Sequence, residues 1–68
     1  MQYVVVIEKS DKNYGVYVPD LPGCVAVGET REEALRLIHE AIELHLQSMQ
    51  AGGELIPPSI TTAELVEV

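Results

Sequence analysis

One long amphipathic helix limits what this chain can fold into. The capping pattern of Thr30 and Glu33 predicts its start and Gly52–Gly53 predict its end, so the helix should run from Thr30 to Ala51. One of its faces is formed by residues at steps of three and four along the chain. They are Ala34, Leu35, Ile38, Ala41, Ile42, His45, Leu46 and Met49. Because the chain has only 68 residues, one small domain must bury this face.

Four segments with the composition of β-strands surround the helix. They are Tyr3–Ile7, Tyr14–Val18 and Cys24–Val27 before it and Ile60–Val68 after it. The polar segment 9–13 predicts a hairpin loop, and Leu21–Pro22–Gly23–Cys24 has the pattern of a type II turn. The order β-β-β-α-β with a right-handed crossover predicts an α+β fold. We expect the sheet order 3-2-1-4, with the helix on one face.

This arrangement leaves one sheet face and the far end of the helix without a cover, which predicts self-association. The first strand is apolar on both faces, so Val4 and Val6 are expected on the uncovered one. The helix is roughly 30 Å long, whereas strands of five or six residues span about 17–20 Å. Its last turns, with Leu44, Leu46 and Met49, should therefore extend past the sheet. A single cysteine forms no internal disulfide, so we expect a dimer or tetramer that uses these five residues.

The charge of the chain argues against nucleic acid and anionic membranes as direct partners. It has 11 acidic and 4 basic residues and a net charge of −7. Phosphates are neutralised by basic surfaces, whereas this acidic chain attracts a basic macromolecule. No apolar run approaches the ~20 residues that cross a bilayer, and the N-terminus lacks the basic start of a signal peptide. We therefore expect a cytoplasmic protein.

The residue spacing does not favour a metal, cofactor or nucleophile site. His39 and His45 are six residues apart, so they lack the four-residue spacing of paired metal ligands on a helix. His39 and Glu43 share a face, and we interpret them as an exposed salt bridge. Cys24 has no base or positive neighbour nearby in the sequence, so we expect a buried apolar residue.

Two linked stretches resemble the signature of the HicB family of antitoxins. They are Tyr17–Val18–Pro19–Asp20–Leu21–Pro22–Gly23–Cys24 and Val27–Gly28–Glu29–Thr30–Arg31–Glu32–Glu33–Ala34–Leu35, and the likeness extends over nearly the whole chain. The resemblance implies a partial ribonuclease H-like fold without nuclease activity. It also implies dimers or larger assemblies that mask HicA, a small basic toxin that cleaves messenger RNA.

Many members of this family carry a C-terminal helix-turn-helix or ribbon-helix-helix segment that binds operator DNA. This sequence ends at Val68, at the end of the expected fourth strand. We therefore expect a single HicB-like domain over residues 1–68, without a separate DNA-binding domain.

The sequence thus predicts a HicB-like antitoxin module, not an enzyme, that binds a HicA-type toxin. The expected partner-binding residues lie in the turn and along the acidic side of the helix. They are Asp20, Leu21, Pro22, Gly23, Cys24, Glu29, Glu32, Glu33, Glu40 and Glu43. The turn residues also have a purely structural interpretation, because Pro22 and Gly23 suit the backbone geometry.

The sequence leaves two alternative functions open. The first is an oligomeric adaptor or structural protein of the same fold that has no toxin partner. The second is a residual metal-dependent nuclease that uses Glu8, Glu40 and Glu64. The first strand, the helix and the fourth strand contain no aspartate, so we expect these glutamates to form a solvated surface.

Overall fold

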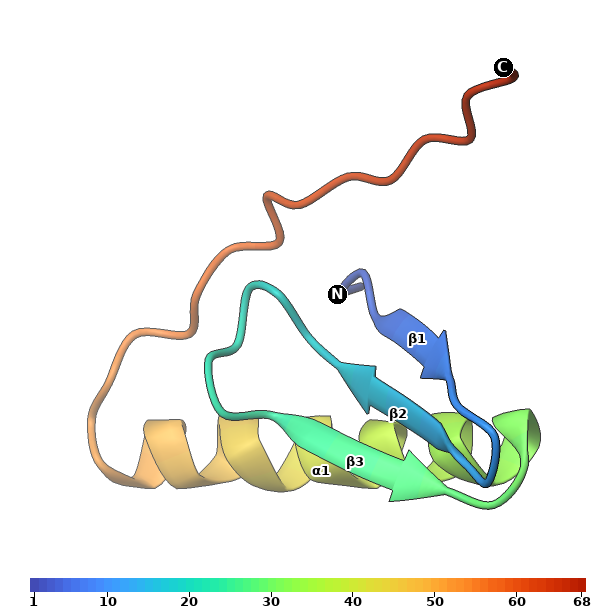
Figure 1. Cartoon of the computed structure of the whole chain (residues 1–68). Coiled ribbons are helices and arrows are strands. Elements are labelled where there is room, and N and C mark those ends of the chain that lie inside the picture. The colour runs from blue at the N-terminus through green and yellow to red at the C-terminus, as the bar shows by residue number, and fades with distance from the viewer.

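A computed structural model describes all 68 residues as a sheet with one helix packed across it (Figure 1). The elements are β1 (Val6–Lys9), β2 (Tyr14–Tyr17), β3 (Val25–Gly28) and α1 (Arg31–Ala51). The sheet is antiparallel and has the order β1-β2-β3. The α+β class, the first three strands of the predicted order and the helix on one face are therefore confirmed. α1 does not combine the length and the apolar character needed to cross a bilayer.

The strand register decides which side chains reach the helix. Val16 in β2 lies opposite Ile7 in β1 and Ala26 in β3. These side chains belong to the core or pack against it. The six buried core residues are Val16, Val18, Leu21, Cys24, Ala34 and Ile38. The core therefore lies between β2, the loop that follows it and the first half of α1.

The opposite face of the sheet has no cover within the chain. Val6 lies opposite Tyr17, and Tyr17 lies opposite Val25. Val25 and Val27 are 64% and 59% exposed. Val6 therefore occupies the uncovered face, as predicted, within an apolar row of side chains.

Capping interactions fix the two ends of α1. Thr30 is the N-cap, and its Oγ1 accepts a hydrogen bond from the Glu33 amide at 3.1 Å. The Glu33 carboxylate in turn accepts the amide of Glu29 at 2.8 Å. At the other end, the amides of Gly53 and Glu54 donate to carbonyls of the last helical turn. The predicted helix boundaries are confirmed.

Gly28 allows the end of β3 to lie directly against the start of α1. A Cβ atom at this position would lie 2.5 Å from the amide nitrogen of Ala34 and 2.9 Å from its Cα. A larger residue would therefore push the strand and the helix apart.

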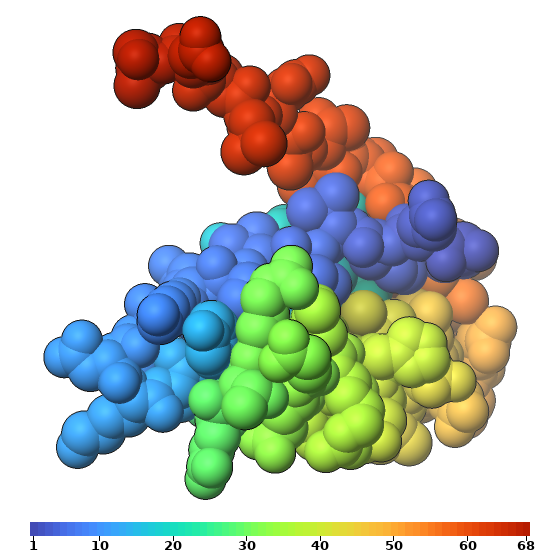
Figure 2. Space-filling view, turned by 90° about the vertical axis from the view of Figure 1, so that its right-hand side faces the viewer, coloured from blue at the N-terminus to red at the C-terminus, as the bar shows by residue number.

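The predicted fourth strand is not formed in the single chain, so the order 3-2-1-4 is not realised and the sheet ends at β1. Residues 54–68 have no regular secondary structure. The segment Thr62–Val68, which we call the arm, extends away from the body, as Figures 1 and 2 show. After α1 the chain does not turn back along the outer edge of β1, so no fourth strand can pair there (Figure 1). Tyr3–Val5, expected in the first strand, likewise precede β1 without a strand partner.

Candidate partner-binding surface

The loop between β2 and β3 consists of two overlapping tight turns. The Leu21 amide donates to the Val18 carbonyl at 3.1 Å, and the Cys24 amide donates to the Leu21 carbonyl at 3.0 Å. Gly23 has a φ of 83°, which the third position of a type II turn requires. The turn predicted from Pro22 and Gly23 is therefore confirmed.

This loop offers a partner fewer side chains than the sequence predicts. Leu21 is fully buried and Cys24 is 3% exposed, because both side chains point into the core. Burial also raises the pKa of the Cys24 thiol, as expected of a thiol that packs as an apolar residue. These two residues cannot contact a partner docked on the surface, which corrects the predicted set. Pro22 and Gly23 are exposed at the tip of the loop.

Asp20, the polar residue of the loop, holds the C-terminal segment of its own chain. Its Oδ2 accepts the amides of Ile60 and Thr61, each at 3.0 Å, and its Oδ1 accepts the Thr61 hydroxyl at 2.7 Å. The hydrogen bond from the Thr61 hydroxyl is the largest cause that lowers the pKa of Asp20, followed by that from the Thr61 amide. Partial desolvation opposes them, and the Ile60 amide lowers the pKa further. Asp20 is therefore an anchor as well as a candidate contact.

A further hydrogen bond, from the N-terminal part of the chain, holds the same segment. The Tyr3 hydroxyl donates to the Pro57 carbonyl at 2.5 Å. Together the Tyr3 and Asp20 anchors hold Pro57–Thr61 against the body of the protein. Neither anchor was predicted from the sequence. Tyr3 and Pro57 are 54 residues apart, Asp20 and Thr61 are 41 apart, and no local motif connects either pair.

An open groove of about 760 Å³ lies beside this anchored segment. Met1–Val5 form one side of it, and α1 forms the other with Leu35, Ile42 and Leu46. Ser59, Thr61 and Thr62 also line it. α1 packs mainly against β3 and β2, so its flank toward β1 has no strand above it.

The predicted acidic residues are distributed along α1 and do not form one cluster. Glu29 and Glu33 are joined by the hydrogen bond at the helix start. Glu32 is exposed in the first turn, where a carboxylate interacts favourably with the helix dipole.

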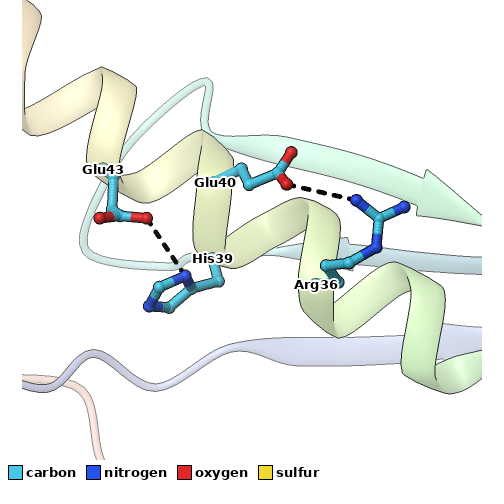
Figure 3. A network of polar contacts seen from close by, with 4 residues as sticks. All are labelled: Arg36, His39, Glu40 and Glu43. Carbon is cyan, nitrogen blue, oxygen red and sulfur yellow. Dashed lines mark hydrogen bonds and ion pairs between the residues drawn. The ribbon is translucent and has the colours of Figure 1, made fainter.

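Two exposed ion pairs occupy the middle of the helix (Figure 3). Arg36 Nη1 lies 3.2 Å from Glu40 Oε1, and His39 Nδ1 lies 3.3 Å from Glu43 Oε1. Both are i,i+4 pairs on the solvent side, where such contacts contribute little to stability. The His39–Glu43 pair matches the predicted salt bridge.

The structure does not bring the three nuclease candidates into a metal-binding arrangement. Glu8 belongs to β1, Glu40 to α1 and Glu64 to the arm, and no group of three or more His, Cys, Asp or Glu residues is placed to hold a metal ion.

The residues predicted for an oligomer interface do not form one patch. Val6 is on the uncovered sheet face, while Val4 and Leu46 line the groove. Leu44 is 66% exposed on the solvent side of α1, and Met49 is half-buried near its end.

Comparison with known proteins decides the family. A family described as "HicB_like antitoxin of bacterial toxin-antitoxin system" matches residues 3–67. The chain belongs to this HicB-like antitoxin family. The match confirms the resemblance seen in the turn and at the helix start.

The sequences of several known proteins align with most of this HicB-like chain. It is 45% identical to a UPF0150 protein of Thermoplasma acidophilum over 84% of each chain. It is 54% identical to a UPF0150 protein of Helicobacter pylori over 68% of this chain and 64% of that one. An uncharacterized 14.9 kDa protein in the rep-hol intergenic region of Haemophilus phage HP1 is 42% identical over 87% of this chain. The match spans 44% of the phage protein's length. No solved structure matches the chain.

Proposed function

We propose that this HicB-like chain is a cytoplasmic antitoxin that binds and neutralises a small basic toxin of the HicA type, which cleaves messenger RNA. The observation that carries the proposal is the family match over residues 3–67. The net charge of −7 supports it, because an acidic chain attracts a basic partner.

The solvent side of α1 is the surface that we assign to the toxin. Glu32, Glu40 and Glu43 are exposed there, and Glu29 extends the surface to the helix start. The ion pairs of Glu40 and Glu43 are weak, so a cationic partner can replace them at small cost. A toxin that cleaves RNA needs basic groups to hold phosphates. Carboxylates that occupy those groups exclude RNA from the toxin.

Asp20 and Cys24, whose pKa values are shifted, have structural roles in the chain. Strongly shifted pKa values often mark catalytic sites. The pKa of Asp20 is lowered and that of Cys24 is raised, and each shift has a structural cause. Hydrogen bonds to the C-terminal segment explain the first, and burial in the core explains the second.

A second candidate function is that of an oligomeric adaptor without a toxin partner. The uncovered apolar row on the sheet favours it, because Tyr17, Val25 and Val27 need a protein cover but not a basic one. Both candidates include a dimer or tetramer, so recovery of a partner separates them.

The first test is recovery of the partner. The tagged chain is purified from its own cells near physiological salt, and proteins present in stoichiometric amount are identified by mass spectrometry. The antitoxin proposal predicts a small basic protein with ribonuclease activity. A discrete oligomer of the chain alone would support the adaptor instead.

The second test places the recovered toxin on α1. Replacing two carboxylates in Glu40→Lys/Glu43→Lys should raise the Kd for the toxin by about tenfold or more, because two attractive charges become repulsive. Isothermal titration calorimetry measures the change. The control is Glu54→Lys, which alters an exposed glutamate beyond the helix. Equal Kd values for the helix variant, the control and the unmodified chain would rule out this surface.

A further inference from the structure

The single chain exposes more surface than a folded protein of its mass. Its accessible surface is 5328 Å², against about 4,200 Å² expected for a folded monomer of 7.5 kDa. The excess of about 1,100 Å² is larger than the ~800 Å² that each partner loses in a standard protein interface. The radius of gyration, 13.2 Å, also exceeds the ~11 Å expected for this length. An interface of ordinary size would therefore remove most of this surplus surface.

Much of the surplus lies in the arm. Leu65 is fully exposed and Val66 is 78% exposed. Beyond Thr61 the arm makes no hydrogen bond within the chain. Its β-branched and leucine side chains suit a strand, but in the single chain nothing covers them. The anchors at Tyr3 and Asp20 hold the base of the arm and leave the rest free.

The outer edge of β1 has no strand beside it. β1 pairs with β2 on one side only, so its other edge has unpaired backbone groups that can accept a further strand. The groove lies between α1 and Met1–Val5, the segment that leads into β1, and most of the residues that line it are apolar. The arm and the segment Tyr3–Lys9 are equally long, and each spans about 23 Å when extended.

We propose that the arm of each chain pairs with the free β1 edge of a second copy and covers its groove. The arm leaves its own body at the anchors and does not follow its own β1 (Figures 1 and 2). A second copy presents the same edge and receives the same arm, so the exchange is reciprocal and closes as a twofold dimer. The missing fourth strand is thus supplied by the partner copy. This inference concerns the chain alone, and Glu43, which lines the groove, is the one residue that it shares with the surface assigned to the toxin.

The test measures the mass of the full chain by light scattering, without toxin. The full chain should be a dimer, and a chain that ends at Thr61 should be a monomer. The double variant Leu65→Lys/Val66→Lys should weaken the dimer by about tenfold or more, because at least one of the two side chains enters the interface. Both residues are exposed in the single chain, so the variant does not disturb its core.

Leu55→Lys is the matched control, because Leu55 is equally exposed but precedes the anchors. It should leave the dimer intact. A monomeric full chain would overturn the inference, as would a dimer that is unaffected by loss of the arm.

Hydrogen exchange identifies the acceptor edge. Amides within Tyr3–Lys9 should be protected in the full chain and exchange faster in the double variant. A dimer that depends on the arm but leaves these amides equally exposed would place the arm elsewhere and overturn the pairing with β1.

Discussion

At the scale of single residues, Asp20 connects two distant parts of the chain. A carboxylate in a surface loop would ordinarily be a candidate for partner binding. Here three hydrogen bonds from Ile60 and Thr61 occupy it. The base of the arm is therefore positioned by one ionisable side chain.

The anchor should depend on pH in a defined direction. Hydrogen bonding lowers the pKa of Asp20 from its ordinary value of 3.8. Its contribution to stability is therefore complete above pH 3.8 and is lost as the pH falls through the lowered value. In NMR titrations, the amide signals of Ile60 and Thr61 should shift with a midpoint below 3.8. A midpoint at or above 3.8 would contradict the anchor.

Substitution tests the same anchor at neutral pH. Asp20→Asn replaces one acceptor oxygen with a donor, so the amides of Ile60 and Thr61 should exchange faster with solvent. Asp11→Asn makes the same chemical change in the exposed hairpin loop and serves as the control. Similar exchange rates in both variants would show that Asp20 does not hold the segment.

Cys24 should react slowly with thiol reagents. Its side chain is buried and its pKa is raised, so little thiolate is exposed at pH 8. We expect a thiol reagent such as Ellman's reagent to label the native chain at least about a hundredfold more slowly than the chain in denaturant. Equally fast labelling of both would contradict the position of Cys24 in the core.

At the scale of elements, the contact between β3 and α1 depends on Gly28. Gly28→Ala should lower the free energy of unfolding by about 1–3 kcal/mol, because the added carbon lies too close to the Ala34 backbone. Gly15→Ala is the matched control, because its nearest atom is 4.0 Å away and we expect a change below about 0.5 kcal/mol. Urea unfolding measures both. Equal losses in the two variants would contradict the close approach.

Elements defined by local interactions were predictable from the sequence. The start of α1 depends on Thr30 and Glu33, and the type II turn depends on Pro22 and Gly23, so each is encoded within four residues. The pairing of Ile60–Val68 was not predictable in this way. Its β-forming composition indicates a strand, but it does not indicate which edge, in which chain, the strand joins.

The candidate site was predicted in part for the same reason. The carboxylates on α1 lie on its solvent side because the helical period places them there. Leu21 was included among the partner-binding residues although it is buried, because a turn motif does not show which side chains point inward. Cys24 was included as well, although its sequence surroundings already indicated the burial that the structure shows. The Asp20–Thr61 anchor joins residues 41 apart, so only the three-dimensional structure connects them.

At the scale of the whole molecule, the two proposed interactions should respond oppositely to salt. Two copies that each carry −7 repel one another, so screening should leave the dimer unchanged or tighten it. Toxin binding joins opposite charges, so screening should weaken it. Sedimentation of the chain alone and calorimetry with the toxin, each at about 0.05 and 0.5 M salt, separate the two effects. A dimer that dissociates as salt rises would contradict an apolar interface.

Under the proposed function, the chain neutralises a ribonuclease by binding it. The most direct measurement is RNA cleavage by the recovered basic partner while purified chain is added at physiological salt. The proposed function predicts that cleavage falls in proportion to the added chain and stops near a fixed stoichiometry. Cleavage that continues unchanged in excess chain would contradict it, whatever the oligomeric state of the chain.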